Sequence, residues 1–529
     1  MKINSKDKEK VMKIFFNDGL KTSKRQLFNT AFGIITCLAI ISILSIFVKP
    51  VFAESVKRGG TLVASMTGTP EFVDPHTAIS IEDVTLTRAI YDSLVYTDHT
   101  LTPQPELAEK WDSSDATVWT FYLRKGVLFH HGREMDADDV VWSYNRILDP
   151  KIASPARKTF SMIESVKKID KYTVQITLNR PFSEFPNLIG GVFQGRIGPR
   201  DVTDLNKKPI GTGPFKLVEF VPGEHATLAR NENYWKNGQP YLDKVRFVYF
   251  PEMTSHISGI SRGKIDVVWS PSADVLPVLK SNKDITVRSI ATSAYQPFIM
   301  RTDVAPFNDK RVRQAFKYIV DREAMNDIVN GGYGIVGNDH PVPPSSAMYM
   351  KQTPRSQNIE KAKALLSEAG FKDGMDIELL TWTGRAGLVD AGLAFQDMAS
   401  KANVRVKIKT ATQDQFFTKY FLKHNFYVSN WNSRTTLYEL FSFPYYSEAK
   451  WNETHWKNKE FDDLLHTIGS ETDKEKQKEL WAKVQELFIS EGPIIVAYHK
   501  PFIVAHRKNV KGYQLHPTAL LDFRTTWLD

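Results

Sequence analysis

Short runs rich in β-branched and aromatic residues, separated by turn clusters, fill the first half of the chain and predict β-strands. These runs are Thr61–Met66, Thr117–Leu123, Tyr172–Leu178 and Lys244–Phe250. A helix is predicted from Asp136, because acidic residues favour a helix start and Val140, Tyr144 and Ile147 follow at helical spacing. This half of the chain therefore predicts a mixed α and β region.

After Arg301 the apolar positions change to helical spacing. One helix is predicted from a cap at Asn308-Asp309 to Gly331-Gly332, with Val312, Phe316, Ile319, Val320 and Ile328 on a single face. Further helices are predicted from Ile359 to Ala369 and from Asp473 to Gly492, and strands at Ile377–Thr381, Val404–Ile408 and Ile494–Tyr498. This alternation predicts an α/β lobe that is distinct from the strand-rich first half, so we expect two lobes with a cleft between them.

The N-terminus carries the pattern of an export signal. A basic leader (Lys2 to Arg25) precedes an apolar stretch (Ala31 to Val48), and Val51 and Ala53 form a small-residue cleavage site. Residues 1–53 are therefore expected to be a cleaved signal peptide, and the alternative is a retained membrane anchor. Residues 22–28, Thr-Ser-Lys-Arg-Gln-Leu-Phe, resemble a twin-arginine motif with lysine in the first arginine position, which leaves the export route open.

Charge and cysteine content narrow the function classes. The net charge of the chain is +9, of which residues 1–53 contribute +6 from nine Lys or Arg and three Asp or Glu. The remainder is nearly neutral, so nucleic acid is not an expected partner. The one cysteine, Cys37, lies in the apolar stretch, and a mature chain without it has no thiolate chemistry.

The sequence contains no convincing catalytic or metal-binding motif. The chain has no Gly-x-Ser-x-Gly elbow and no His-Glu-x-x-His motif. His130-His131 are adjacent, which places them on opposite faces of a strand, and Gly211-Thr212-Gly213 predicts a tight turn rather than a phosphate loop. The pairs Asp138-Asp139 and Asp462-Asp463 are interpreted as solvated acids at helix starts. The expectation is no enzyme activity, no cofactor and no metal.

A series of ordered segments then resembles the peptide- and nickel-type solute-binding proteins of ABC importers (family 5). The most specific block is Trp119–Gly132, with His131 where an aspartate is usual, followed by Asp136–Ser143. The other matching segments are Arg58–Leu62, Asp74-Pro75, Tyr91–Val95, Pro105–Trp111, Gly211–Phe215, Asn233–Trp235, Phe307–Phe316 and Asp321–Ala324.

The resemblance implies a two-lobed periplasmic-binding-protein fold (type II) with an extra subdomain inserted in the first lobe. The expected boundaries are first-lobe segments at 54–88, 207–298 and 501–529, an inserted subdomain at 89–206, and a second lobe at 299–500. Such a protein closes over its ligand because the ligand contacts both lobes better in the closed state.

One departure from the family pattern concerns the ligand. Peptide-binding members usually carry a tryptophan followed closely by an aspartate that holds the α-amino group, and here the stretch is Asn430–Thr436 with Arg434 at the aspartate position. A guanidinium repels an ammonium but pairs with a carboxylate, so an anionic ligand group is predicted. The alternative is that Arg434 pairs with a structural acid such as Glu439. The candidate ligand-binding residues are Arg434, Trp431, Asn432, Thr435, Thr436, Tyr295, Trp382 and Arg385.

The sequence thus predicts a monomeric periplasmic binding component that captures a short peptide or other carboxylate-bearing solute. Its expected partners are that ligand and the permease and ATPase subunits of an ABC importer in the inner membrane. The alternatives are a haem- or metal-chelate-binding protein of the same class, a periplasmic hydrolase on this scaffold, and a surface interaction protein.

Overall fold

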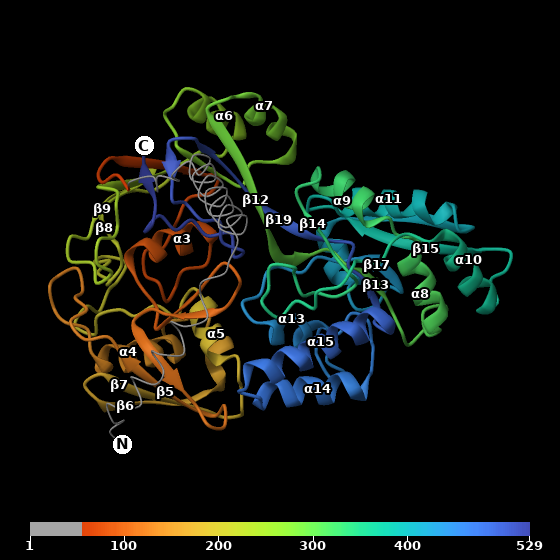
Figure 1. Ribbon diagram of the computed structural model, residues 1–529, viewed down its shortest axis with the longest axis horizontal. Helices are drawn as coiled ribbons and strands as arrows, with labels where there is room; N and C mark the ends of the chain where they lie inside the picture. Colours follow the sequence, from red (N-terminus) through yellow and green to blue (C-terminus); the bar gives the residue numbers. More distant parts are fainter. Residues whose placement is uncertain (1–55) are drawn as a thin grey trace, which may run out of the picture. The chain divides into compact units, whose positions relative to one another are not determined.

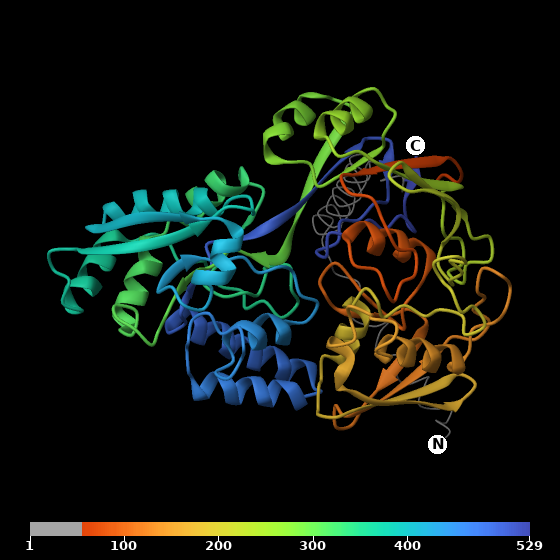
Figure 2. The same cartoon turned by 180° about the vertical axis from the view of Figure 1, so that it is seen from behind.

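The computed structural model describes residues 56–529 (Figures 1 and 2), so the predicted signal peptide, the twin-arginine-like motif and Cys37 lie outside the described residues. Residues 57–529 form one compact unit. Within residues 56–529, no helix has both the length and the apolar character needed to cross a membrane.

The first lobe is built on a mixed sheet of order β12-β19-β11-β1-β10-β9-β8, with β14 also paired to β19. Strand β1 lies between β10 and β11 and is parallel to both, and its alternate residues Leu62, Ala64 and Met66 are buried. The elements of this lobe are β1 (Thr61–Met66), α3 (Ile81–Ile90), β8 (Phe215–Val221), β9 (His225–Arg230), β10 (Lys244–Tyr249), α6 (Met253–Ser261), β11 (Val267–Trp269), η2 (Ala273–Val275), α7 (Leu276–Ser281), β12 (Ile285–Tyr295), β14 (Ile335–Val336) and β19 (Tyr498–Arg507), with β20 (Val510–Lys511) paired to β21 (Trp527–Leu528).

The inserted subdomain has an antiparallel sheet of order β4-β5-β7-β6. Strand β5 alternates strictly between buried and partly exposed residues, which is the pattern of a sheet with one covered face. Helix α4 starts at Asp136 because its carboxylate caps the first turn in a capping box with Asp139. The elements are β2 (Val95–Thr97), β3 (Pro103–Pro105), β4 (Ala108–Asp112), β5 (Val118–Leu123), α4 (Ala137–Leu148), η1 (Thr159–Met162), β6 (Ile163–Asp170), β7 (Thr173–Leu178) and α5 (Phe185–Gly191).

The second lobe contains a sheet of order β16-β15-β17-β13-β18 and the largest hydrophobic core. Helix α11 lies along β15 and β16, and α14 lies beside α15 (Figure 1). The elements are β13 (Phe298–Met300), α8 (Lys310–Ile319), α9 (Arg322–Asn330), α10 (Ile359–Glu368), β15 (Met375–Trp382), α11 (Leu388–Ser400), β16 (Val404–Ala411), α12 (Gln413–Gln415), the π-helical turn η3 (Phe416–Tyr420), β17 (Phe426–Val428), α13 (Leu437–Tyr445), α14 (Lys459–Ser470), α15 (Lys474–Ser490) and β18 (Ile494–Ile495).

Two long antiparallel strands, β12 and β19, connect the lobes (Figures 1 and 2). Strand β12 is followed directly by β13 of the second lobe, and β18 of the second lobe is followed directly by β19. The chain therefore crosses between the lobes twice in adjacent strands. The expected α/β fold with two lobes and an inserted subdomain is confirmed, whereas the residue boundaries expected for each lobe stay predictions.

Two local predictions are wrong. The region 310–330 forms two helices rather than one, because Val320 takes an extended conformation and the Asp321 side chain accepts the Ala324 N–H to cap a new helix. Ile328 consequently lies on the exposed face of the second helix. Asp139 is not a solvated cap either: its carboxylate is fully buried and pairs with Arg133 at 2.7 Å.

Candidate functional site

Arg434 is held by its backbone at the crossing between the lobes. Its N–H donates to the Ser293 hydroxyl at 2.9 Å, and the same hydroxyl donates to the Arg434 carbonyl at 3.0 Å. Three residues earlier, Trp431 forms a two-bond bridge with Tyr295 at the end of β12. These contacts attach the Arg434 loop to the connecting strand, so the position of its side chain depends on the crossing itself.

The Arg434 side chain lines a cavity between the inserted subdomain and the second lobe, which we call the Arg434 cavity. Its volume is about 570 Å³, within the range of a site for a small solute. The subdomain contributes Pro155, Lys158, Thr159, Ser161, Met162, Asn179, Arg180, Phe182 and Leu188. The second lobe contributes Arg434, Tyr438, Glu439, Ser442, Phe443, Ala449, Lys450 and Trp451.

The guanidinium of Arg434 has few interaction partners within the described residues. Its Nε is buried without a hydrogen-bond partner among the described residues, and its Cζ lies 5.6 Å from the centre of the Phe443 ring. Glu439 is near enough to interact with it through space, but the Glu439 carboxylate instead accepts the Thr436 hydroxyl at 3.0 Å. A buried donor of this kind is costly unless a ligand satisfies it.

A close-packed junction between the subdomain and the second lobe borders this cavity. Ser183 donates its N–H to the Gly469 carbonyl at 2.8 Å and its hydroxyl to the Ile468 carbonyl at 2.6 Å. In the opposite direction, the Tyr438 N–H donates to the Glu184 carboxylate at 3.0 Å. The two parts of the chain are thus joined by direct hydrogen bonds in both directions.

Glu184 is the titratable group at this junction. Burial raises the pKa of Glu184 to about 7, with a further contribution from the Glu439 carboxylate, and the Tyr438 N–H only partly opposes them. Burial also raises the pKa of Glu439, although the charge of Arg434 opposes this. The junction therefore holds two carboxyl groups whose pKa values are raised by burial.

We expect the stability contributed by Glu184 to depend on pH. Because its pKa is raised, this stability is fully present below about pH 4.5 and is lost as the pH rises through 7. In a Glu184→Gln protein this contribution no longer titrates. Thermal unfolding should therefore show that, between pH 5 and pH 8, the free energy of unfolding falls by on the order of 2 kcal/mol more in the wild type than in the variant. A matched Glu479→Gln change on the exposed face of α15 should follow the wild type, and identical pH profiles for all three proteins would contradict the prediction.

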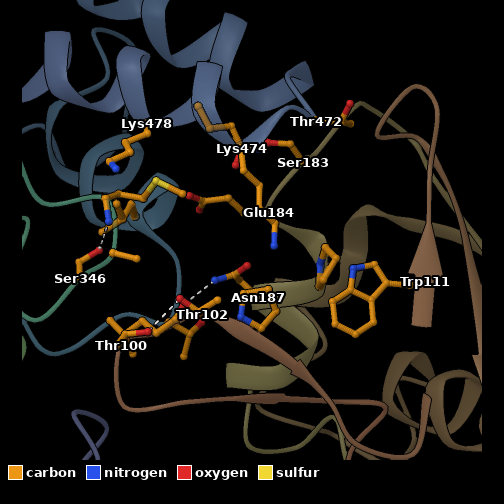
Figure 3. A pocket seen from close by; sticks show the side chains of 18 of the residues that line it. Thr100, Thr102, Trp111, Ser183, Glu184, Asn187, Ser346, Thr472, Lys474 and Lys478 are labelled. Atoms are coloured by element: carbon orange, nitrogen blue, oxygen red, sulfur yellow. Dashed lines mark hydrogen bonds between the residues drawn. The ribbon is translucent and has the colours of Figure 1, made fainter. Parts of the chain in front are cut away.

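A second cavity, of about 520 Å³, shares Ser183 and Glu184 with the junction (Figure 3). Its lining combines Asp112, Glu184 and Glu475 with Lys474 and Lys478 of α15, so acidic side chains outnumber basic ones. The Arg434 cavity is lined by four basic side chains and one acid, and we therefore infer that it is the better candidate for binding an anion.

The aromatic residues among the predicted site residues are engaged in the core. Trp431 is nearly buried and its indole N–H donates to Glu453 at 2.6 Å, while the fully buried Tyr295 bonds Tyr445 through their hydroxyls at 3.0 Å. The Trp382 ring stacks on Phe416 at 4.7 Å, and its N–H donates to the Val428 carbonyl at 3.0 Å. Contact of these rings with a solute stays a prediction, and it would require the rings to become exposed.

The remaining predicted residues divide into two groups. Thr436 caps α13 by accepting the Glu439 N–H, and Thr435 contacts Gly191 so closely that no side chain could be added to that glycine. Asn432 is exposed and accepts from the Asn430 side chain, and Arg385 is exposed with a contact to the Gly384 carbonyl. Of the eight predicted residues, only Arg434 and Thr435 line either of these two cavities.

The histidine pair and the glycine turn, which the sequence did not predict to be functional sites, have structural roles. His130 contacts the Gly213 carbonyl at 3.0 Å, and His131 contacts Asp201 at 3.1 Å. Gly211 and Gly213 pack against the Ile90 backbone, where a Cβ atom would clash, and β8 begins directly afterwards. Within residues 56–529, no group of three or more His, Cys, Asp or Glu side chains is placed to hold a metal ion.

Comparison with known proteins identifies the family. The family described as bacterial extracellular solute-binding proteins, family 5, matches residues 102–453, which is more than half of the chain. The chain belongs to this family. Heme-binding protein A of Haemophilus influenzae is 28% identical over 452 residues, covering 78% of this chain and 82% of the relative. Di/tripeptide-binding protein 2 of Pseudomonas aeruginosa is 28% identical over 512 residues, covering 89% of this chain and 95% of the relative.

A solved structure supports the assignment of this chain to family 5. The structure of HbpA2 from Haemophilus parasuis superposes with a TM-score of 0.83 at 27% identity, covering 89% of this chain and all of that chain. The resemblance inferred from the ordered sequence segments is therefore confirmed.

Several residues of this family 5 protein that line the Arg434 cavity were not predicted from its sequence. Lys158 and Arg180 lie in loops of the subdomain, and Phe443 and Trp451 are aromatic residues that remain exposed in the second lobe. Phe443 gave no usable signal in the sequence, because single exposed apolar side chains are ordinary features of a protein surface. The loop residues Lys158 and Arg180 belong to no sequence motif that would mark them as binding residues.

Proposed function

We propose that this protein captures a short peptide or peptide-like solute with an exposed carboxylate and delivers it to the permease and ATPase of an ABC importer. The observation that carries the proposal is that Arg434 lines a cavity between the subdomain and the second lobe, and that its buried Nε has no hydrogen-bond partner among the described residues. Family membership and the peptide-binding relative support the transport class. Capture without chemical change follows from the same class, and the place of action is the periplasm after export by the N-terminal signal.

Native mass spectrometry of the purified protein, followed by calorimetric titration with di- and tripeptides, tests this function. We expect one peptide per chain, bound stoichiometrically and recovered unchanged from the complex by chromatography. Hydrolysed peptide would instead favour an enzyme built on this scaffold. Failure of every peptide to bind would contradict the proposal.

Haem is the second candidate, because one of the similar proteins is a heme-binding protein. The basic residues of the Arg434 cavity suit carboxylates of any origin, and haem carries two. A haem titration followed by absorbance in the Soret region separates the two candidates. Saturable haem binding that competes with peptide would place both ligands in the same site, whereas haem binding without any peptide binding would replace our proposal.

A further inference from the structure

The charges that line the Arg434 cavity are strongly unbalanced. Lys158 and Arg180 project from the subdomain, and Arg434 and Lys450 from the second lobe, against the single carboxylate of Glu439. Burial raises the pKa of Glu439, although the charge of Arg434 opposes this shift. The cavity therefore carries more positive charge than one carboxylate of a solute would balance.

None of these four cations has an acidic partner within ion-pair distance among residues 56–529. Elsewhere in the same part of the chain many arginines do pair, as Arg133 does with Asp139 and Arg322 with Asp339. Exposed lysines without partners are ordinary features of a surface. The Arg434 Nε is different, because it is buried and lacks any hydrogen-bond partner in the described chain.

Two cations of the subdomain reach aromatic rings of the second lobe, and Arg434 lies over a third ring of that lobe. Lys158 of the subdomain lies 5.9 Å from the ring centre of Trp451 in the second lobe, and Arg180 lies 5.9 Å from that of Tyr438. Arg434 lies over Phe443, whose ring meets Trp451 edge-on with centroids 6.2 Å apart. A continuous aromatic surface thus leads from Arg434 of the second lobe to Lys158 of the subdomain.

We propose that the solute carries at least two acidic groups, one bound by Arg434 and the other by Lys158 and Arg180, with an apolar segment lying on Phe443 and Trp451 between them. This inference rests on the proposed function and specifies its substrate class. A solute with two acids bridges the subdomain and the second lobe through charge, whereas a solute with one acid engages a single wall. Lys158 and Arg180 are then the residues that determine specificity.

Two tripeptides that differ in one group provide the test: Ala-Ala-Glu, with two carboxylates, and its amide analogue Ala-Ala-Gln, with one. By calorimetric titration of the full chain in low salt, we expect the wild type to bind Ala-Ala-Glu at least tenfold more tightly. In a Lys158→Gln/Arg180→Gln protein this ratio should fall to about two. An Arg157→Gln protein is the matched control, because Arg157 is a neighbouring exposed arginine that bonds the Leu148 carbonyl and does not line the cavity.

The outcomes separate the two proposals. Equal affinities of the wild type for both peptides, or a preference for Glu that survives in the double variant, would overturn the two-acid inference while leaving peptide capture intact. Failure of both peptides to bind the wild type would count against the proposed function and the inference together. Lys158 and Arg180 are exposed, so the double variant should fold, and an unchanged melting temperature will verify this.

Discussion

Replacing Arg524 with methionine is expected to destabilise the protein by about 3–5 kcal/mol, a large share of the free energy that keeps a typical domain folded. The guanidinium is buried in the first lobe, where it donates to Glu106 at 2.8 Å and lies 3.9 Å from Asp92. Both carboxylates are fully buried. Methionine preserves much of the volume but leaves these acids without their principal cation, and a buried uncompensated charge is strongly destabilising.

The midpoint of urea denaturation, followed by tryptophan fluorescence, measures this loss. Arg405→Met is the matched control, because Arg405 pairs with Asp376 at 2.7 Å on the surface, where solvent screens the interaction. We expect the control to change the midpoint little. A similar small change for Arg524→Met would mean that Asp92 and Glu106 become protonated without cost, which would contradict the argument. A large loss would show that the C-terminal segment is needed to hold the first lobe together.

The elements that the sequence predicted well are those whose signals are local. Strand β1 matches its predicted bounds and is buried along most of its length, and α4 starts where Asp136 offers a capping box. The single helix predicted across 310–330 failed for a reason that is also local. Asp321 is a strong N-cap in the middle of an otherwise helical apolar pattern, and a cap of this kind can start a new helix.

The candidate site could be predicted only in part, because its residues are distant in the sequence. Arg434 was identified because it replaces an aspartate in the family pattern, and the structure places it in a cavity. Lys158 and Trp451 are neighbours only because the subdomain packs against the second lobe, and no periodicity relates residues so far apart in the chain. Tyr295 and Trp382 were chosen by family analogy, which identifies a position in the fold but does not show whether its side chain is exposed.

Replacing Arg434 with glutamine is expected to weaken the binding of Ala-Ala-Glu by about 10- to 100-fold. The reason is that a charge-assisted hydrogen bond contributes on the order of 1.5–3 kcal/mol, and the guanidinium has no hydrogen-bond or ion-pair partner within the described residues to compensate for losing the ligand. Arg434→Lys should lose less affinity than the glutamine variant, because it keeps the charge but not the planar fork that pairs with a carboxylate. Calorimetric titration of the three proteins gives the comparison.

The structural alternative for Arg434 makes a different prediction for the same variants. If its charge serves mainly to stabilise Glu439, Arg434→Gln should leave peptide affinity within about twofold of the wild type and lower the melting temperature instead. The present contacts favour ligand binding, because the Glu439 carboxylate accepts the Thr436 hydroxyl at 3.0 Å and lies beyond ion-pair distance of the Arg434 guanidinium. An Arg434→Gln/Glu439→Gln protein separates the two roles. Removing the acid as well should restore stability in the structural case, and peptide affinity should stay low if Arg434 binds the solute.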